Sequence, residues 1–186
     1  MAGIYFIAAG SSSRNRTKSL DQNLSAEDVT QHLEPLFKHQ LNQHFVGDEK
    51  VFAWGAATKP RGLDELKQGD YVVDVNNRVV KHVFRYAFMI DTGEDLRLQD
   101  WIGWDAEVPV NERRSFKYVY FLRAPQATRR DKSFFEKAFG QEGNQNWLAG
   151  QRWFSDDEVR AALERTGTRS VEDLLGLEPG ASPAAV

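Results

Sequence analysis

Two runs of β-branched and aromatic residues, separated by Asn76-Asn77, limit the folds open to this chain more than any other feature. Tyr71 to Val75 and Arg78 to Phe88 have the composition of β-strands. Two Asn residues can adopt the positive φ of a tight turn, so the sequence predicts a β-hairpin here. Further strands are predicted at Ile4 to Ala9, Val51 to Ala56 and Phe116 to Leu122.

Helices are predicted after the first strand and in the last third of the chain. Ser25 caps the first of them with Asp28 as its partner, and Pro35 predicts a kink or two short helices in series. Phe134, Phe135, Ala138 and Phe139 form one apolar helical face, which Gly140 ends. Two more helices begin at capping boxes, Ser155 with Glu158 and Ser170 with Asp173.

The segments Ser11 to Ser19 and Asp91 to Asn111 are predicted to be loops. The resulting order of strands and helices predicts an α+β domain built on a small mixed β-barrel flanked by helices. A length of 186 residues suits one domain with a sizeable core, which we expect to span residues 1–177. Residues 178–186, rich in Pro, Gly and Ala, are expected to form a linker or a disordered tail.

The chain contains no cysteine, which excludes disulfides, thiolate zinc sites and thiol catalysis. Its short apolar start lacks a basic flank and a cleavage site, and no stretch approaches the roughly 20 apolar residues of a membrane span. We therefore expect a cytoplasmic protein with no membrane partner. The net charge is −3, so any contact with nucleic acid would need a local basic patch.

Enzymatic motifs are weak. Lys18-Ser19 lacks the glycine spacing of a phosphate-binding loop, and the four histidines lack metal-ligand spacing. Glu65-Leu66-Lys67 fits the letters of a metal-dependent nuclease, but it falls on a predicted helical turn rather than on a strand. No cofactor or metal is predicted, and the chain is expected to bind rather than to catalyse.

Tryptophans are the more informative candidates. Trp54 lies in a predicted strand beside the small residues Gly55 and Ala56, and Trp101 and Trp104 lie in a predicted loop around a glycine. Indole faces can stack on a nucleobase, which contributes roughly 1–3 kcal/mol per base. A strand Trp is more often a core residue, so the loop pair favours a binding role more strongly than Trp54 does.

Basic residues recur in the predicted loops although the whole chain is acidic. Each alone is an ordinary solvated charge, but their recurrence near strand ends favours contacts with phosphates. They are Arg14, Arg16, Lys18, Lys59, Arg61, Arg113, Arg114, Arg129, Arg130 and Lys132.

Several motifs together resemble a known family. The first strand ends in Ala-Ala-Gly-Ser-Ser-Ser, and Val-Phe-Ala-Trp-Gly-Ala, Leu-Lys-Gln-Gly-Asp-Tyr-Val, Tyr-Val-Tyr-Phe-Leu and Trp-Leu-Ala-Gly-Gln-Arg-Trp-Phe follow in that order. Over about Gly3 to Gly176 the chain resembles the EVE domains of the PUA-like superfamily, relatives of the YTH methyladenosine-binding domains. It looks most like the EVE modules that precede HNH nucleases in modification-dependent restriction enzymes.

The resemblance implies that a modified nucleotide is flipped out and held between aromatic walls. Trp54 beside Gly55 would be one wall, and Trp101 or Trp104 the other. Asp105 would accept a hydrogen bond from an exocyclic amine. Hydrogen bonds to the base edge would come from Ser11, Ser12 and Ser13.

From these features we expect binding of double-stranded DNA that carries a modified base, 5-methylcytosine or 5-hydroxymethylcytosine. The chain would act as the specificity module of a restriction system. It has no HNH cluster, so a nuclease would be fused to it or act in trans. The alternatives are an RNA-binding PUA-like module and a cryptic nuclease using Glu65 and Lys67.

Overall fold

The computed structural model describes residues 2–8, 13–47, 49–59, 62–76, 79–144, 147 and 151–178. The chain forms two compact units. The first unit combines three segments, Met1–Gly10, Pro60–Tyr86 and Pro125–Ala185, and the second combines Ser11–Lys59 with Ala87–Ala124.

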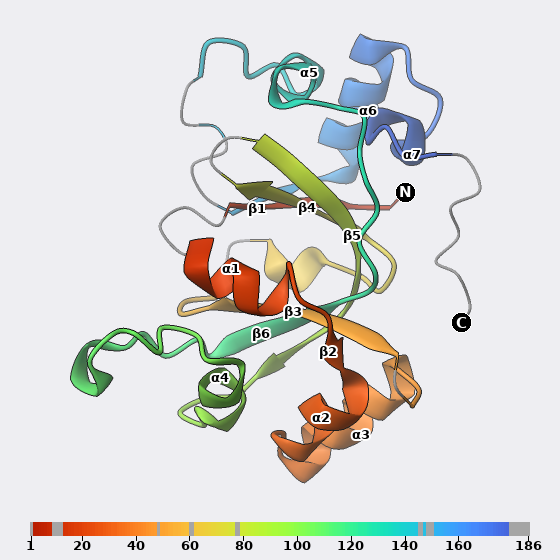
Figure 1. The fold of residues 1–186 in the computed structure, drawn as a ribbon. Helices are drawn as coiled ribbons and strands as arrows, with labels where there is room; N and C mark the ends of the chain where they lie inside the picture. Colours follow the sequence, from red (N-terminus) through yellow and green to blue (C-terminus); the bar gives the residue numbers. More distant parts are fainter. Residues whose placement is uncertain are drawn as a thin grey trace. The chain divides into compact units, whose positions relative to one another are not determined.

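The sheet of the first unit is organised around β1 (Ile4–Ala8), as Figure 1 shows. β1 pairs in parallel with β4 (Tyr71–Asn76) on one side and antiparallel with β7 (Arg152–Phe154) on the other. β4 also pairs antiparallel with β5 (Val79–Asp91), and the register of this pairing shifts between Asp74 and Val75. The hairpin predicted around Asn76-Asn77 is therefore confirmed, although Asn77 and Arg78 lie outside the described residues.

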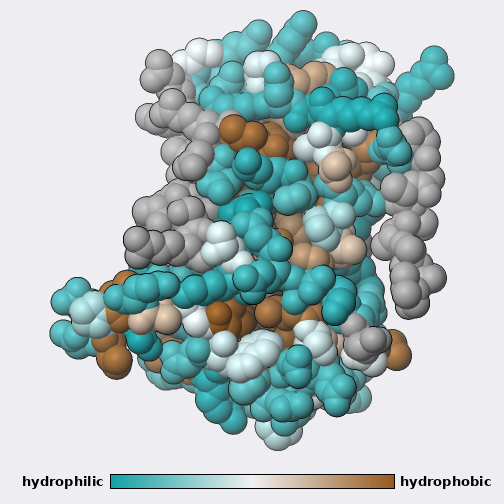
Figure 2. Space-filling view, viewed as in Figure 1, coloured by the Kyte–Doolittle hydropathy of each residue, from teal (hydrophilic) through white to brown (hydrophobic). Residues whose placement is uncertain are grey.

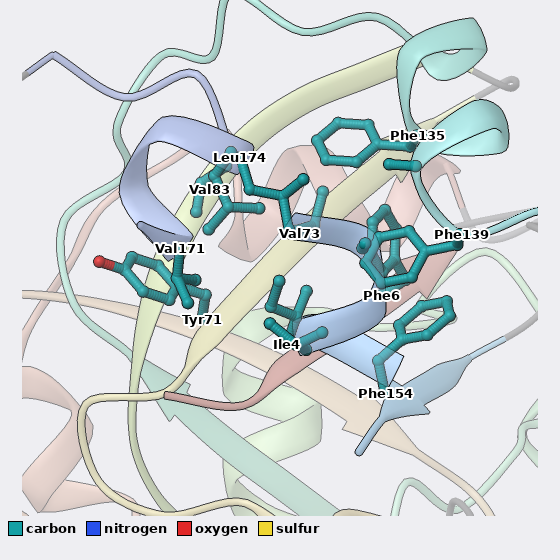
Figure 3. Close-up of a cluster of buried hydrophobic side chains, with 14 of the residues drawn as sticks. Ile4, Phe6, Tyr71, Val73, Val83, Phe135, Phe139, Phe154, Val171 and Leu174 are labelled. Carbon is teal, nitrogen blue, oxygen red and sulfur yellow. The ribbon is translucent and has the colours of Figure 1, made fainter. Parts of the chain in front are cut away.

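Helices cover one face of this sheet. They are α5 (Lys132–Ala138), α6 (Asp156–Thr166) and α7 (Val171–Leu174), and the short 3-10 segment η2 (Leu63–Glu65) precedes β4. Figure 3 shows their side chains packed on the strands, with Phe6 among the aromatic rings. The Phe139 and Phe154 rings stack with centroids 3.9 Å apart. Ser155 and Glu158 form the predicted capping box of α6.

The second unit has the hydrogen-bonded strand order β2-β3-β6-β5, in which the part of β5 from Ala87 onward takes part. β2 (Leu24–Ser25), β3 (Lys50–Ala56) and β6 (Tyr118–Leu122) pair antiparallel in turn. Its helices are α1 (Ser13–Ser19), α2 (Ala26–Gln31), α3 (Pro35–His44) and α4 (Arg97–Ile102), with the 3-10 segment η3 at Val110–Glu112.

The Pro35 prediction is confirmed, because α2 and α3 are two short helices in series and Pro35 is at the start of α3. Ser25 caps α2 by accepting a hydrogen bond from the Asp28 amide. The α+β class is confirmed as well. Two loop predictions are wrong: most of residues 11–19 forms α1, and the segment 91–111 contains α4. The strand β7 was not predicted.

The strand order over the described residues is β2-β3-β6-β5-β4-β1-β7. Since β2 and β7 stand at its two ends, the pairings within this part of the chain form a seven-stranded mixed sheet and do not close the predicted barrel. The face of the molecule in Figure 2 is mostly hydrophilic, with small hydrophobic patches between polar side chains. None of the helices in the described ranges combines the length and apolar composition needed to cross a bilayer.

Candidate functional site

A small aromatic cavity in the second unit is the centre of the candidate site. It is lined by Trp54 and Gly55 from β3, Trp104 from the turn after α4, Phe116 before β6, and Asn15 from α1. Both indoles are buried, with 5% of Trp54 and 1% of Trp104 exposed. The strand and the helix-terminal turn thus bring together side chains that are about fifty residues apart in the chain.

Gly55 makes this convergence possible. A Cβ atom at position 55 would lie 2.6 Å from Cζ3 of Trp104 and 2.8 Å from Cβ of Phe116, well inside normal contact distance. The absence of a side chain lets both rings pack against the β3 backbone. Trp104 and Phe116 then meet edge to face, with ring centroids 5.5 Å apart and an interplanar angle of 73°.

A polar network borders the cavity. The Asn15 side-chain amide donates to Oδ1 of Asp105 at 2.7 Å, and its oxygen accepts from the Asp105 backbone amide at 2.9 Å. Asp105 has a left-handed backbone with φ of 52°, which is uncommon for a residue other than glycine. Nε of Arg114 donates to Oδ2 of Asp105, the other carboxylate oxygen, at 3.1 Å.

These contacts decide the ionisation of Asp105. Burial alone would raise the pKa of its carboxyl group, but the hydrogen bonds from Arg114 and Asn15 and the charge of Arg114 outweigh burial and lower the pKa. Asp105 is therefore a carboxylate at neutral pH. It can accept hydrogen bonds and cannot donate one.

The two indole N–H groups differ. Nε1 of Trp104 donates to Oγ of Ser19 at 3.1 Å, and Ser19 in turn donates to the Asn15 carbonyl oxygen at 3.2 Å. Nε1 of Trp54 is buried and has no acceptor among the described residues. A buried donor without a partner costs free energy, so the wall formed by Trp54 retains an unmet hydrogen-bonding capacity.

The cavity is nearly filled by its own walls. Its volume is about 10 Å³, roughly the minimum that holds one water molecule. A nucleobase is several times larger than water. A base could therefore enter between Trp54 and Trp104 only if these rings moved apart or one of the lining side chains swung outward.

The structure brings three of the predicted base-binding residues together, namely Trp54, Gly55 and Trp104, with Asp105 beside them. Trp101 is not among the lining residues of this cavity. It is half-buried on α4 and stacks on the His32 ring, with centroids 4.6 Å apart and an interplanar angle of 16°. Ser13 begins α1, while Ser11 and Ser12 lie outside the described residues.

Two lining residues, Asn15 and Phe116, were not predicted from the sequence. Asn15 belongs to a polar run that was predicted to be a loop, and nothing in its neighbours distinguishes it. Phe116 was counted as a strand residue. Its position before β6 places it next to Gly55, whose lack of a side chain is the one signal that could have indicated a close approach.

Most of the predicted phosphate-binding residues have partners within the protein. Arg16 is buried against Asp21, and Arg114 is bound to Asp105. Lys59 is exposed, the side chain of Arg14 is not described, and Arg61 lies outside the described residues. The remaining contacts are Lys18 with Glu107, Arg113 with the Val108 and Ala106 carbonyl oxygens, Arg129 with Glu178, Arg130 with Asp173, and Lys132 with Glu136.

No group of three or more His, Asp or Glu side chains in the described ranges is arranged to hold a metal ion. Glu65 ends η2 and Lys67 follows it, so the triplet considered for a nuclease lies in a 3-10 turn and the segment after it. This agrees with the helical turn that the sequence predicted there.

No protein-family model matches the chain, and no curated protein matches it. Among solved structures, the chain is similar to the N-terminal domain of Thermococcus gammatolerans McrB bound to m5C DNA. The TM-score is 0.64 at 11% sequence identity, and the match covers 89% of this chain and 97% of that one. At this identity the similarity shows a shared fold.

Proposed function

We propose that this chain is an EVE-type, PUA-like module that binds double-stranded DNA carrying 5-methylcytosine or 5-hydroxymethylcytosine. It would flip the modified base out of the duplex and provide the specificity of a modification-dependent restriction system. The observation that carries the proposal is the convergence of Trp54, Gly55 and Trp104 on one aromatic cavity. The fold adds support, because the similar McrB domain was solved with m5C DNA.

In this proposal the two indoles hold the flipped base by stacking. Stacking contributes roughly 1–3 kcal/mol per base, which is comparable with the few kcal/mol that extruding a base costs. The free energy gained by stacking therefore exceeds the free energy of extrusion by little. A 5-methyl group that fills apolar space adds about 0.8 kcal/mol, so a small modification can decide whether flipping is favourable.

The edge of the base would be recognised by the polar border of the cavity. The Asn15 amide carries an acceptor and a donor, which match the exocyclic N4 amine and the N3 acceptor of cytosine. In the free protein both groups bind Asp105. Binding would exchange these contacts for contacts with the base, and the Asp105 carboxylate would then accept a hydrogen bond from an exocyclic amine of the base.

The phosphate backbone would be bound by the basic residues named from the sequence. Residues that form ion pairs in the protein, such as Lys18 with Glu107, would share their charge between protein carboxylates and DNA phosphates. Such binding weakens steeply as salt rises, which gives the proposal a second measurable property.

The test uses duplexes of one sequence in which a single cytosine is unmodified, 5-methylated or 5-hydroxymethylated, and an RNA duplex of the same sequence. Binding is followed by fluorescence anisotropy at fixed salt. We expect a preference of about fourfold or more for one modified DNA, which corresponds to the roughly 0.8 kcal/mol of a buried methyl group. Trp54→Ala should abolish the preference.

Trp101→Ala is the matched control, because it removes an indole that does not line the cavity. It should retain the preference for modified DNA. Circular dichroism and thermal melting establish that each variant is folded. Equal affinity for modified and unmodified duplexes would refute the proposal, and tighter binding to the RNA duplex would favour an RNA-binding module instead.

A further inference from the structure

A second and much larger hollow lies in the first unit, beside Trp153 of β7. It has a volume of about 580 Å³ and is lined by Gly62, Glu65, Gln151, Arg152, Trp153 and Glu158. An adjoining hollow of about 290 Å³ shares Glu65 and Trp153 with it. Small-molecule sites in proteins have volumes of about 300–1,000 Å³, so the larger hollow is big enough for a nucleobase or a nucleotide.

The Trp153 side chain is packed between two backbone segments, one at Gly62 and one at Gly3. Gly62 has φ of +80°, and a Cβ atom there would lie 2.5 Å from Cβ of Trp153. A Cβ atom on Gly3 would lie 3.4 Å from the indole Nε1. Two glycines thus allow the main chain to pack closely against this side chain, which makes Trp153 a rigid wall of both hollows.

This wall has an unmet hydrogen-bonding capacity. Nε1 of Trp153 is buried and has no acceptor among the described residues. Oε1 of Gln151 accepts a hydrogen bond from the Tyr5 hydroxyl at 2.9 Å, which leaves the Gln151 amide hydrogens as donors. Arg152 adds a guanidinium group, which lies 4.7 Å from the centroid of the Phe154 ring and makes a long contact of 3.4 Å with Glu158.

Acceptors are supplied by carboxylates. One oxygen of Glu158 is used by the Ser155 backbone amide at 2.9 Å in the capping box of α6. Glu65 is exposed, and its carboxylate makes no hydrogen bond or ion pair with the part of the chain that the structure describes. The hollow therefore combines a flat ring, several donors and one carboxylate available for a ligand.

This combination selects among the nucleobases. A carboxylate binds best to two adjacent N–H donors, and guanine alone presents such a pair on its Watson–Crick edge, at N1 and N2. Adenine and cytosine place an acceptor next to their amine, and uracil and thymine flank one N–H with two carbonyl groups. The O6 and N7 acceptors of guanine also suit a guanidinium donor such as Arg152.

We propose that this hollow binds a guanine base. Trp153 would stack on the ring, Glu65 would accept from N1–H and N2–H, and Arg152 would donate to the opposite edge. The two lining carboxylates disfavour a phosphate in the same position, so the base itself is the group recognised. This inference does not depend on modified-base binding in the second unit. The guanine could belong to a free nucleotide or to a single strand.

The test titrates the full chain with GMP, AMP, CMP and UMP by isothermal calorimetry, and with the oligonucleotides TTGTT and TTATT to separate the two sources. We expect GMP to bind at least about tenfold more tightly than the other mononucleotides. Glu65→Gln should remove that preference, and Trp153→Phe should weaken binding to GMP. If only TTGTT binds, the guanine is recognised within a strand.

Glu164→Gln is the control, because it makes the same chemical change at an exposed position on α6 away from the hollow. It should leave GMP binding unchanged. If neither guanine ligand binds at millimolar concentration, if all bases bind equally, or if Glu65→Gln has no effect, the proposal is wrong. Glu65→Gln should retain the preference for methylated duplex, so failure of this inference is distinguishable from failure of the proposed function.

Discussion

Replacing Gly55 with alanine tests the aromatic cavity most directly. The substitution adds one methyl group, and Gly55 does not have the positive φ that would itself strain an alanine. Any loss of stability therefore results from the close packing of the Trp104 and Phe116 rings against position 55. Gly55 is paired with Val119 of β6, so the backbone cannot retreat without disturbing that strand pairing.

The size of the effect follows from the distances. The new methyl carbon would lie 2.6 Å from Trp104 and 2.8 Å from Phe116, against the 3.4–4 Å of ordinary contact. Adding a methylene-sized group to a packed core typically costs about 1–3 kcal/mol. For a protein of this length each kcal/mol lowers the melting temperature by roughly 2–4 °C.

The assay is urea unfolding of four proteins: the wild type, Gly55→Ala, Trp104→Phe and the double variant. Phenylalanine is smaller than the indole, so the added methyl group should cost less free energy of unfolding in the Trp104→Phe background. The difference is the coupling energy between the two positions, which for contacting residues is about 0.5–3 kcal/mol. Gly55→Ala should also reduce binding to methylated duplex, because it narrows the cavity further.

Two results would refute this reasoning. One is a Gly55→Ala protein whose free energy of unfolding equals that of the wild type within about 0.5 kcal/mol, the usual range of neutral surface substitutions. The other is an equal loss of stability in both backgrounds, which would mean that Trp104 is not the side chain that the methyl group meets.

Three further predictions concern stability. Because the pKa of Asp105 is lowered from 3.8 in the folded protein, its ionised form stabilises the fold above pH 3.8, and this stabilisation is lost as the pH falls through the folded-state pKa. Asp105→Asn should therefore make the free energy of unfolding, measured in urea from pH 7 to 2, depend less steeply on pH in the acid range. An unchanged slope would contradict this. Ser155→Ala removes the N-cap of α6 and should cost about 1 kcal/mol in urea unfolding, whereas Ser155→Gly should cost only a few tenths; equal losses would argue against the cap. Phe135→Ala empties a fully buried position beside Phe6 and should cost about 3–5 kcal/mol, seen as a large fall in melting temperature; a loss below 1 kcal/mol would mean that the core collapses around the gap.

Local signals in the sequence predicted the elements whose causes are local. Ser25 and Ser155 cap helices through contacts three residues away, and Pro35 separates two helices by its own covalent geometry. β-branched runs predicted β4 and β5 for the same reason. Each of these features depends on neighbours that can be seen within one window of the chain.

Elements without such signals were missed. α4 has no side-chain cap, and α1 is polar on all sides, so neither differs from a loop in sequence. β7 has only three residues, and it is a strand because β1 pairs with it. Contacts with the rest of the fold give these segments their helical or strand structure. The propensity of the isolated segment does not include those contacts, so it could not predict the structure.

In the candidate site, too, the sequence predicted residue types but not the positions that depend on tertiary contacts. Trp101 and Trp104 look equivalent in sequence, yet one stacks on His32 outside the cavity and the other lines it. Three residues apart on one continuous helix, the two side chains would share a face, but α4 ends at Gly103, whose left-handed φ of 82° turns the chain before Trp104. Asn15 reaches the site through the fold of α1, a step that could not be predicted while that segment was taken for a loop.

The pairing of β1 has a consequence for the order in which the chain can fold. Gly3 bonds to Asp70, 67 residues away, and Tyr5 bonds to Gln151, 146 residues away. A ribosome would therefore release the first strand long before either neighbour exists. The apolar residues of β1 must stay soluble, or be shielded by chaperones, until the chain has been made as far as Gln151, and closing such distant contacts predicts slow refolding.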